Sequence, residues 1–84
     1  MKNILIVEDE PDIQELLRAY LRDAGYRTAV AGDGVEALSL FAQQTFDLIL
    51  LDLNLPGTDG LEILRQFREH NTNTPVLILS ARDQ

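Results

Sequence analysis

Three short, uninterrupted apolar runs constrain the fold of this chain more than any other feature. They span residues 4–7, 48–51 and 76–79. None of them alternates with polar residues, as a strand with one solvated face would. Continuous apolar runs of this length are typical of parallel strands that are covered on both faces. They predict strands over Ile4–Val7, Leu48–Leu51 and Val76–Leu79, and a weaker run predicts another over Tyr26–Ala31.

A helix is predicted between the first two strands, because apolar residues recur there at helical spacing. Pro11 suits the first turn of this helix, and Gly25 suits its end. The apolar positions share one face of a helix, and we interpret Tyr20 and the phenylalanines as core residues. These positions are Ile13, Leu16, Leu17, Tyr20, Leu21 and Ala24.

Two further helices are predicted by capping signals. Asp33 and Glu36 have the spacing of an N-cap residue and its N3 partner, and Asp59 and Glu62 repeat this spacing. Apolar residues follow each signal on one helical face: Val35, Leu38 and Phe41, then Leu61, Ile63, Leu64 and Phe67. Strands and helices therefore alternate along the chain. This alternation predicts an α/β fold, with right-handed crossovers and an open parallel sheet.

The residues that follow the strands are the candidate site, because ligands of such sheets bind outside the carboxyl ends of the strands. Acids occupy residues 8–10 after the first strand, and Asp52 ends the third. If these strands are neighbours, Asp9 and Asp52 converge, and their like charges raise one another's pKa. A hard cation would relieve this repulsion. Oxygen ligands without His or Cys favour Mg²⁺, or Mn²⁺, over zinc.

A carboxylate beside Mg²⁺ can attack phosphorus and form an aspartyl phosphate. We therefore interpret Asp52 as a nucleophile held at a strand end. Ser80 follows the fourth strand, and its hydroxyl can donate a hydrogen bond to a phosphoryl oxygen; the backbone N–H of Ala81 can donate another. Plain structural interpretations also exist: residues 8–10 suit a solvated helix start, Asp52 suits a turn cap and Ser80 suits an N-cap.

Three segments resemble the receiver domain of two-component response regulators. They are VEDE at 7–10, LILLDLNLPGTDGLEIL at 48–64 and TPVLILSARD at 74–83. The LSARD and LPGTDGLE stretches resemble most the winged-helix, OmpR/PhoB-type subclass. The resemblance implies a flavodoxin-like (CheY-like) open parallel sheet with helices on both faces and the strand order 2-1-3-4.

The resemblance also implies a role for each site residue. Asp52 accepts a phosphoryl group from a sensor histidine kinase, Asp9 binds Mg²⁺ directly, and Glu8 binds it through water. The main-chain carbonyl of Asn54 completes the protein ligands. Ser80 is the switch hydroxyl. Asn54 and Ala81 occupy positions that tune the lifetime of the phosphoryl group.

The resemblance implies elements that this 84-residue sequence does not contain. They are a fifth strand, two helices, a lysine that pairs with the phosphoryl group, and a DNA-binding effector domain. Residues 1–84 are therefore expected to form a partial receiver domain, truncated after the fourth strand. Residues 76–79 then become a bare apolar edge, which favours an edge-paired or domain-swapped homo-oligomer.

Charge and composition exclude other classes of protein. The net charge of −7 repels phosphate backbones, so this segment is not expected to bind nucleic acid directly. No apolar run approaches the ~20 residues of a membrane span. The chain has no cysteine, and we expect it in the cytoplasm.

Two rival functions remain at this point. One is a phosphatase of the haloacid dehalogenase type, which requires D-x-D, whereas this chain has Asn54 at the second position. The other is a receiver-like interaction module that is not phosphorylated. In our main interpretation the chain is no enzyme but a phosphoacceptor that takes part in its own phosphorylation and dephosphorylation.

Overall fold

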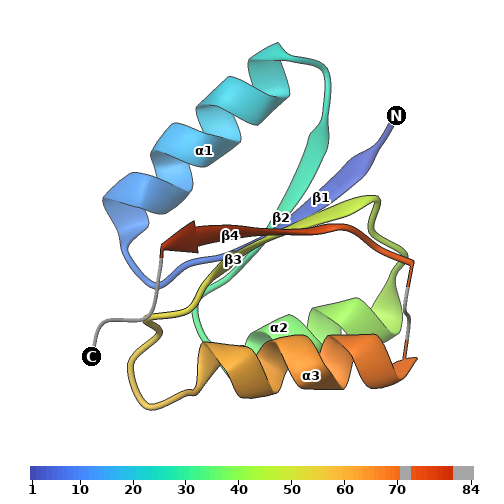
Figure 1. The fold of residues 1–84 in the computed structure, drawn as a ribbon. Helices are drawn as coiled ribbons and strands as arrows, with labels where there is room; N and C mark the ends of the chain where they lie inside the picture. The colour runs from blue at the N-terminus through green and yellow to red at the C-terminus, as the bar shows by residue number, and fades with distance from the viewer. Residues whose placement is uncertain (71–72, 81–84) are drawn as a thin grey trace.

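Four parallel strands alternate with three helices in the computed structural model, which describes residues 1–70 and 73–80 (Figure 1). The elements are β1 (Asn3–Val7), α1 (Pro11–Asp23), β2 (Arg27–Ala31), α2 (Gly34–Gln43), β3 (Leu48–Asp52), α3 (Gly60–His70) and β4 (Val76–Ser80). The predicted alternation is confirmed, and each strand boundary lies within one residue of its predicted position.

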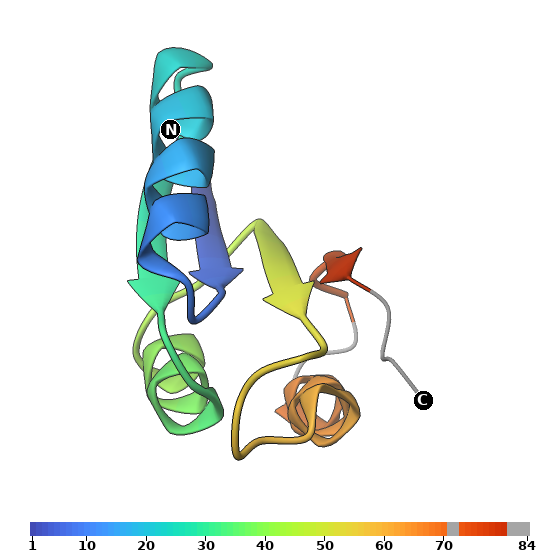
Figure 2. The same ribbon diagram turned by 90° about the vertical axis from the view of Figure 1, so that its left-hand side faces the viewer.

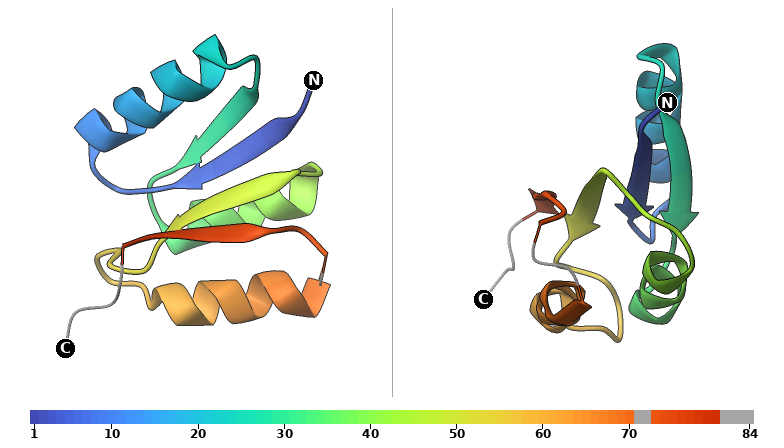
Figure 3. Two further views of the ribbon diagram at one scale, coloured as in Figure 1. Left: turned by 45° about the horizontal axis from the view of Figure 1, so that its top comes forward. Right: turned by 90° about the vertical axis from the view of Figure 1, so that its right-hand side faces the viewer.

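The strands lie in the order β2-β1-β3-β4, and every neighbouring pair is parallel. Figure 3 (left) shows the four strands side by side in this order. Leu5 of β1 lies opposite Ala29 of β2 and Ile49 of β3. The order implied by the resemblance is therefore confirmed. It places the ends of β1 and β3 next to each other.

The continuous apolar runs are explained by helices on both faces of the sheet. α1 covers one face, and α2 and α3 cover the other (Figures 1 and 2). Alternate residues of each strand face opposite helices: Leu5 and Ile49 pack in the core under α2 and α3, whereas Ile6 and Leu50 pack on the side of α1. Each run must therefore be apolar at every position.

The helix α1 buries less of its apolar face than its periodicity predicts. Leu17 and Leu21 pack against the sheet. Leu16 is 57% exposed and Tyr20 is 70% exposed, so the prediction of Tyr20 as a core residue is wrong. The predicted face is wider than the strip that touches β1 and β2. In the same way Val35 of α2 is 81% exposed.

The edge of the sheet formed by β4 is apolar, as predicted. β4 comes last in the strand order, and its Leu77 and Ile78 are exposed. Pairing of this edge with a second chain stays a prediction. Among the described residues, no helix combines the length and the apolar character that crossing a membrane requires.

Candidate functional site

The carboxyl ends of β1 and β3 lie next to each other and face the viewer in Figure 2, and the residues that follow them line a crevice. Val7 and Leu51 are register partners, so Glu8 and Asp52 follow side by side. The pairing of β3 with β4 shifts between Leu51 and Asp52. The crevice has a volume of about 530 Å³ and is lined by Glu8, Asp9, Glu10, Ile13, Asp52, Asn54, Pro56, Leu79 and Ser80.

Three carboxylates converge in this crevice. Glu8, Asp9 and Asp52 each place a carboxylate oxygen within 4.8 Å of the others. Glu8 is 3% exposed and Asp52 is 7% exposed. None of the ion pairs between described residues involves any of the three. The predicted convergence of Asp9 and Asp52 is therefore observed, and no basic side chain in the described part of the chain neutralises the charges.

The environment of Glu8 favours its protonated form. Burial, above all, raises the pKa of this carboxyl, because a charged group loses hydration there. A hydrogen bond from the backbone N–H of Glu10 acts in the opposite direction, and the negative charge of Asp52 adds to the rise. The balance leaves the pKa of Glu8 above its ordinary value.

Hydrogen bonds fix the orientation of Asp52. Its Oδ1 accepts a hydrogen bond from the backbone N–H of Asn54 at 2.9 Å and another from the hydroxyl of Ser80. The Asn54 side-chain amide donates in turn to the Ser80 hydroxyl at 3.2 Å. Among the described residues, none donates a hydrogen bond to Oδ2 of Asp52. That oxygen is therefore the one available to a cation or a reacting group.

The loop after β1 is held by backbone contacts and by one side chain that sequence reasoning missed. The N–H of Glu8 donates to the carbonyl of Ala31 at 3.0 Å. The carbonyl of Glu8 accepts a 2.6 Å hydrogen bond from the side-chain amide of Gln14 in α1. A glutamine seven residues after a strand forms no recognised motif, so the sequence held no signal for this contact.

The site residues predicted from the sequence gather in this one crevice. Glu8, Asp9, Asp52, Asn54 and Ser80 all line it, and Ala81 lies outside the described residues. Two of the plain structural alternatives fit less well, whereas Asp52 does accept the hydrogen bond of a turn cap, from the N–H of Asn54. Glu8 is buried in the crevice instead of being solvated, and Ser80 bonds to Asp52. Helix α1 begins after Glu10, which makes no capping bond through its side chain.

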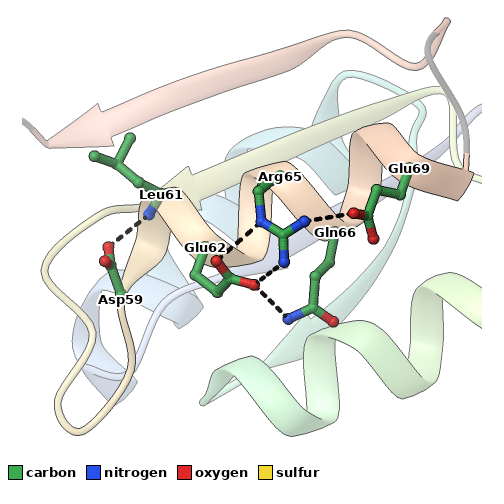
Figure 4. A network of polar contacts seen from close by, with 6 residues as sticks. All are labelled: Asp59, Leu61, Glu62, Arg65, Gln66 and Glu69. Atoms are coloured by element: carbon green, nitrogen blue, oxygen red, sulfur yellow. Dashed lines mark hydrogen bonds and ion pairs between the residues drawn. The ribbon is translucent and has the colours of Figure 1, made fainter.

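Several acids elsewhere on the domain are bound by basic or backbone groups. Figure 4 shows Arg65 of α3 between Glu62 and Glu69, with its guanidinium bonded to both carboxylates. Asp59 accepts from the N–H of Leu61 at 3.0 Å, as a helix cap does. The predicted partnership of Asp59 and Glu62 at this cap is only half observed, because Glu62 bonds to Arg65 and Gln66 instead.

The helix α2 follows its predicted capping pattern more closely. Asp33 accepts a hydrogen bond from the N–H of Glu36 at 2.8 Å. The Glu36 carboxylate reaches back to the N–H of Gly32 at 2.9 Å. These two bonds fix the start of α2.

Sequence relatives point to the same family as the geometry. The family model of the response regulator receiver domain matches residues 4–84. The transcriptional regulatory protein YxdJ of Bacillus subtilis is 46% identical over 82 residues, which are 98% of this chain and 35% of YxdJ. The chain spans about a third of the length of the first curated relatives that it matches.

Solved structures agree with this match. The response regulator TrrA from Thermotoga maritima, in complex with Mg²⁺-BeF, has a TM-score of 0.83 at 41% identity and covers 93% of this chain and 66% of its own. TrrA in complex with the histidine kinase ThkA has a TM-score of 0.89 at 39% identity, over 100% of this chain and 72% of the other. This chain therefore belongs to the response regulator receiver domain family and has its flavodoxin-like, CheY-like fold.

Proposed function

We propose that this chain accepts a phosphoryl group on Asp52 from a phosphohistidine of a sensor histidine kinase, in a reaction that requires Mg²⁺ or, less specifically, Mn²⁺. One observation carries the proposal. Three carboxylates lie within 4.8 Å of one another, and one of them keeps an oxygen to which no described residue donates. The ThkA–TrrA complex supports the choice of a histidine kinase as donor, because this chain resembles TrrA.

The residues of the crevice fit a hard divalent cation. They offer oxygen atoms only, and their negative charge has no basic partner among the described side chains. Asp9, Asp52 and the carbonyl of Asn54 would hold Mg²⁺ directly, and Glu8 would hold it through water. When bound, the cation offsets the negative charge of the incoming phosphoryl group. The Mg²⁺-BeF complex of TrrA supports this choice of metal.

The transfer uses Asp52 as an ionised nucleophile. Its Oδ2 forms a bond to phosphorus while the P–N bond of the phosphohistidine breaks, and the imidazole leaves with the electron pair. The two hydrogen bonds to Oδ1 hold the carboxylate in one orientation during attack. Afterwards the Ser80 hydroxyl can donate to a phosphoryl oxygen, as can the backbone N–H of Ala81. The chain is then a phosphoacceptor and switch, not an enzyme with turnover.

The output of this switch lies outside the segment in our proposal. YxdJ is a transcriptional regulatory protein that is about three times as long as the matched segment, which supports transcription control by the longer protein. Residues 1–84 would be the partial receiver domain of a longer regulator of this kind, located in the cytoplasm. The net charge of −7 supports a segment that does not itself bind DNA.

The phosphatase alternative has weaker support. A haloacid dehalogenase needs a second aspartate two residues after the nucleophile, and Asn54 cannot act as a general acid there. The family match also points to receivers. An interaction module that is never phosphorylated remains the outcome opposite to our proposal.

Intact mass spectrometry tests the proposal after incubation with Mg²⁺ and a small acyl phosphate. We expect one phosphoryl adduct on the parent chain, none on Asp52→Asn and none with EDTA. Glu62→Gln is the matched control, because it removes an acid on α3 and should leave the adduct unchanged. No adduct on the parent, or an equal adduct on Asp52→Asn, would overturn the proposal.

A further inference from the structure

Two buried glycines have no conformational reason to be glycine. Gly34 and Gly60 are the first residues of α2 and α3. The glycines with left-handed backbone are Gly25 and Gly57, at φ of 93° and 68°. Alanine is the better helix former at positions with ordinary helical backbone. The explanation for Gly34 and Gly60 must therefore lie in the space around them.

Gly60 lies directly against the backbone that carries the site. A Cβ atom at this position would stand 2.5 Å from the Cα of Leu53 and 3.0 Å from its carbonyl oxygen. Ordinary contact begins at 3.4 Å. Leu53 is the residue between Asp52 and Asn54, so any backbone shift that makes room for a methyl group moves both of its neighbours.

Gly34 packs against the loop that joins β3 to α3, at the end of the loop farther from Asp52. A Cβ atom here would stand 2.5 Å from Cγ2 of Thr58 and 2.6 Å from Cδ1 of Ile63. These atoms are ends of side chains, which can shift more easily than backbone can. The first turn of α2 therefore touches the β3–α3 loop, residues 53–59, close to the start of α3.

The loop between these contacts presents Asn54 to the crevice. Leu53 packs against the core under α2 and α3, and Leu55 is 5% exposed. Asn54 stands between these two anchors, is exposed and lines the crevice. The depth at which Leu53 is seated therefore sets where the Asn54 backbone lies relative to Asp52.

We propose that Gly34 and Gly60 are positioning residues, whose missing side chains seat the β3–α3 loop so that Asp52 and Asn54 can bind one cation together. The inference rests on the proposed function. It adds two residues that touch neither metal nor phosphoryl group. It also predicts a larger effect on Mg²⁺ binding at Gly60 than at Gly34, because a side chain at Gly60 would meet backbone, whereas one at Gly34 would meet movable side-chain ends.

Calorimetric titration with Mg²⁺ tests this proposal on the parent chain and on Gly60→Ala, Gly34→Ala and Gly32→Ala, at a temperature where circular dichroism shows each variant folded. We expect Gly60→Ala to weaken Mg²⁺ binding by roughly tenfold to a hundredfold, as loss of outer-shell support does. Gly34→Ala should weaken it less. Gly32→Ala is the matched control, because its Cβ would find its nearest neighbour, Nε2 of Gln14, only at 3.8 Å.

A rescue experiment separates positioning from general destabilisation. Adding Thr58→Ser and Ile63→Val to Gly34→Ala removes the two atoms nearest to the new methyl group and leaves only Cγ1 at residue 63, at 3.1 Å. Mg²⁺ affinity should return toward that of Thr58→Ser/Ile63→Val alone. This series decides the question if Gly60→Ala does not fold. Alanine variants that lose stability but bind Mg²⁺ as tightly as Gly32→Ala would overturn the inference and leave the proposed function intact. A parent chain that binds no Mg²⁺ would instead overturn the proposed function.

Discussion

Carboxylates lie in two opposite electrostatic settings on this domain. In the crevice, Glu8, Asp9 and Asp52 face one another without a basic partner among residues 1–70 and 73–80, and burial raises the pKa of Glu8. On α3, Glu62 and Glu69 flank Arg65 at the solvated surface. There the hydrogen bond from Arg65 lowers the pKa of Glu62 (Figure 4).

The contrast indicates what each group of acids does. The pairs on α3 are three or four residues apart on one helix, and they stabilise that helix only slightly because water screens them. The crevice acids are brought together by the sheet order, at a cost in desolvation and repulsion. Uncompensated charge of this kind suits a site that binds a cation.

The largest effect on stability is expected for Asp9→Asn in the absence of metal. Removing one of three like charges relieves repulsion, so we expect the free energy of unfolding to rise by about 1 kcal/mol. Urea denaturation in EDTA measures this change. Glu69→Gln is the control on α3, where removal of an acid should give no gain because that acid has a cationic partner. Loss of stability in Asp9→Asn would contradict the claim that the crevice carboxylates repel one another.

A smaller effect is expected in the pH dependence of stability. Because the pKa of Glu8 is raised in the folded chain, the folded state holds its proton more tightly than the unfolded state does. The resulting stabilisation is complete below the ordinary value of 4.5 and is lost as pH rises through the raised pKa. Urea midpoints in EDTA should therefore fall over this range. In Glu8→Gln this fall of the urea midpoint with pH should be absent. A pH profile in that variant equal to the parent's would contradict the assignment of the fall to Glu8.

The smallest effect is expected for Arg65→Ala on α3. Its ion pairs are exposed, so the thermal midpoint should fall only slightly, and the difference from the parent should shrink in 1 M salt. Phosphoryl uptake at Asp52 should not change. A large loss of stability that persists in high salt would mean that this network contributes more than a solvated surface pair.

Much of the fold and the site could be predicted because the signals are local. Uninterrupted apolar runs such as residues 48–51 mark strands covered on both faces, and the parallel sheet then places Asp52 beside Asp9. The resemblance supplied the strand order, which alternation alone does not determine. Asp33 was predictable as a cap, because its spacing to Glu36 is sufficient to place the hydrogen bond.

Other features depend on what packs opposite, and the sequence does not encode that locally. Tyr20 belongs to an apolar helical face, yet only the strip of α1 next to the sheet is buried. The Glu62 side chain could bond either to the helix start or to Arg65. It bonds to Arg65, which lies three residues later on the same helix face. The contact of Gly60 with Leu53 is a matter of tertiary packing between the start of α3 and the loop that precedes it.

The most direct test of the central claim is the dependence of the urea midpoint on Mg²⁺ concentration. If the crevice carries its charge for a cation, Mg²⁺ at a hundredfold excess over its dissociation constant should stabilise the parent chain by about 2.7 kcal/mol. The same titration should leave Asp9→Asn nearly unmoved and Glu62→Gln fully responsive. An equal response in all three chains, or none in the parent, would contradict the claim that these buried carboxylates form a cation site beside Asp52.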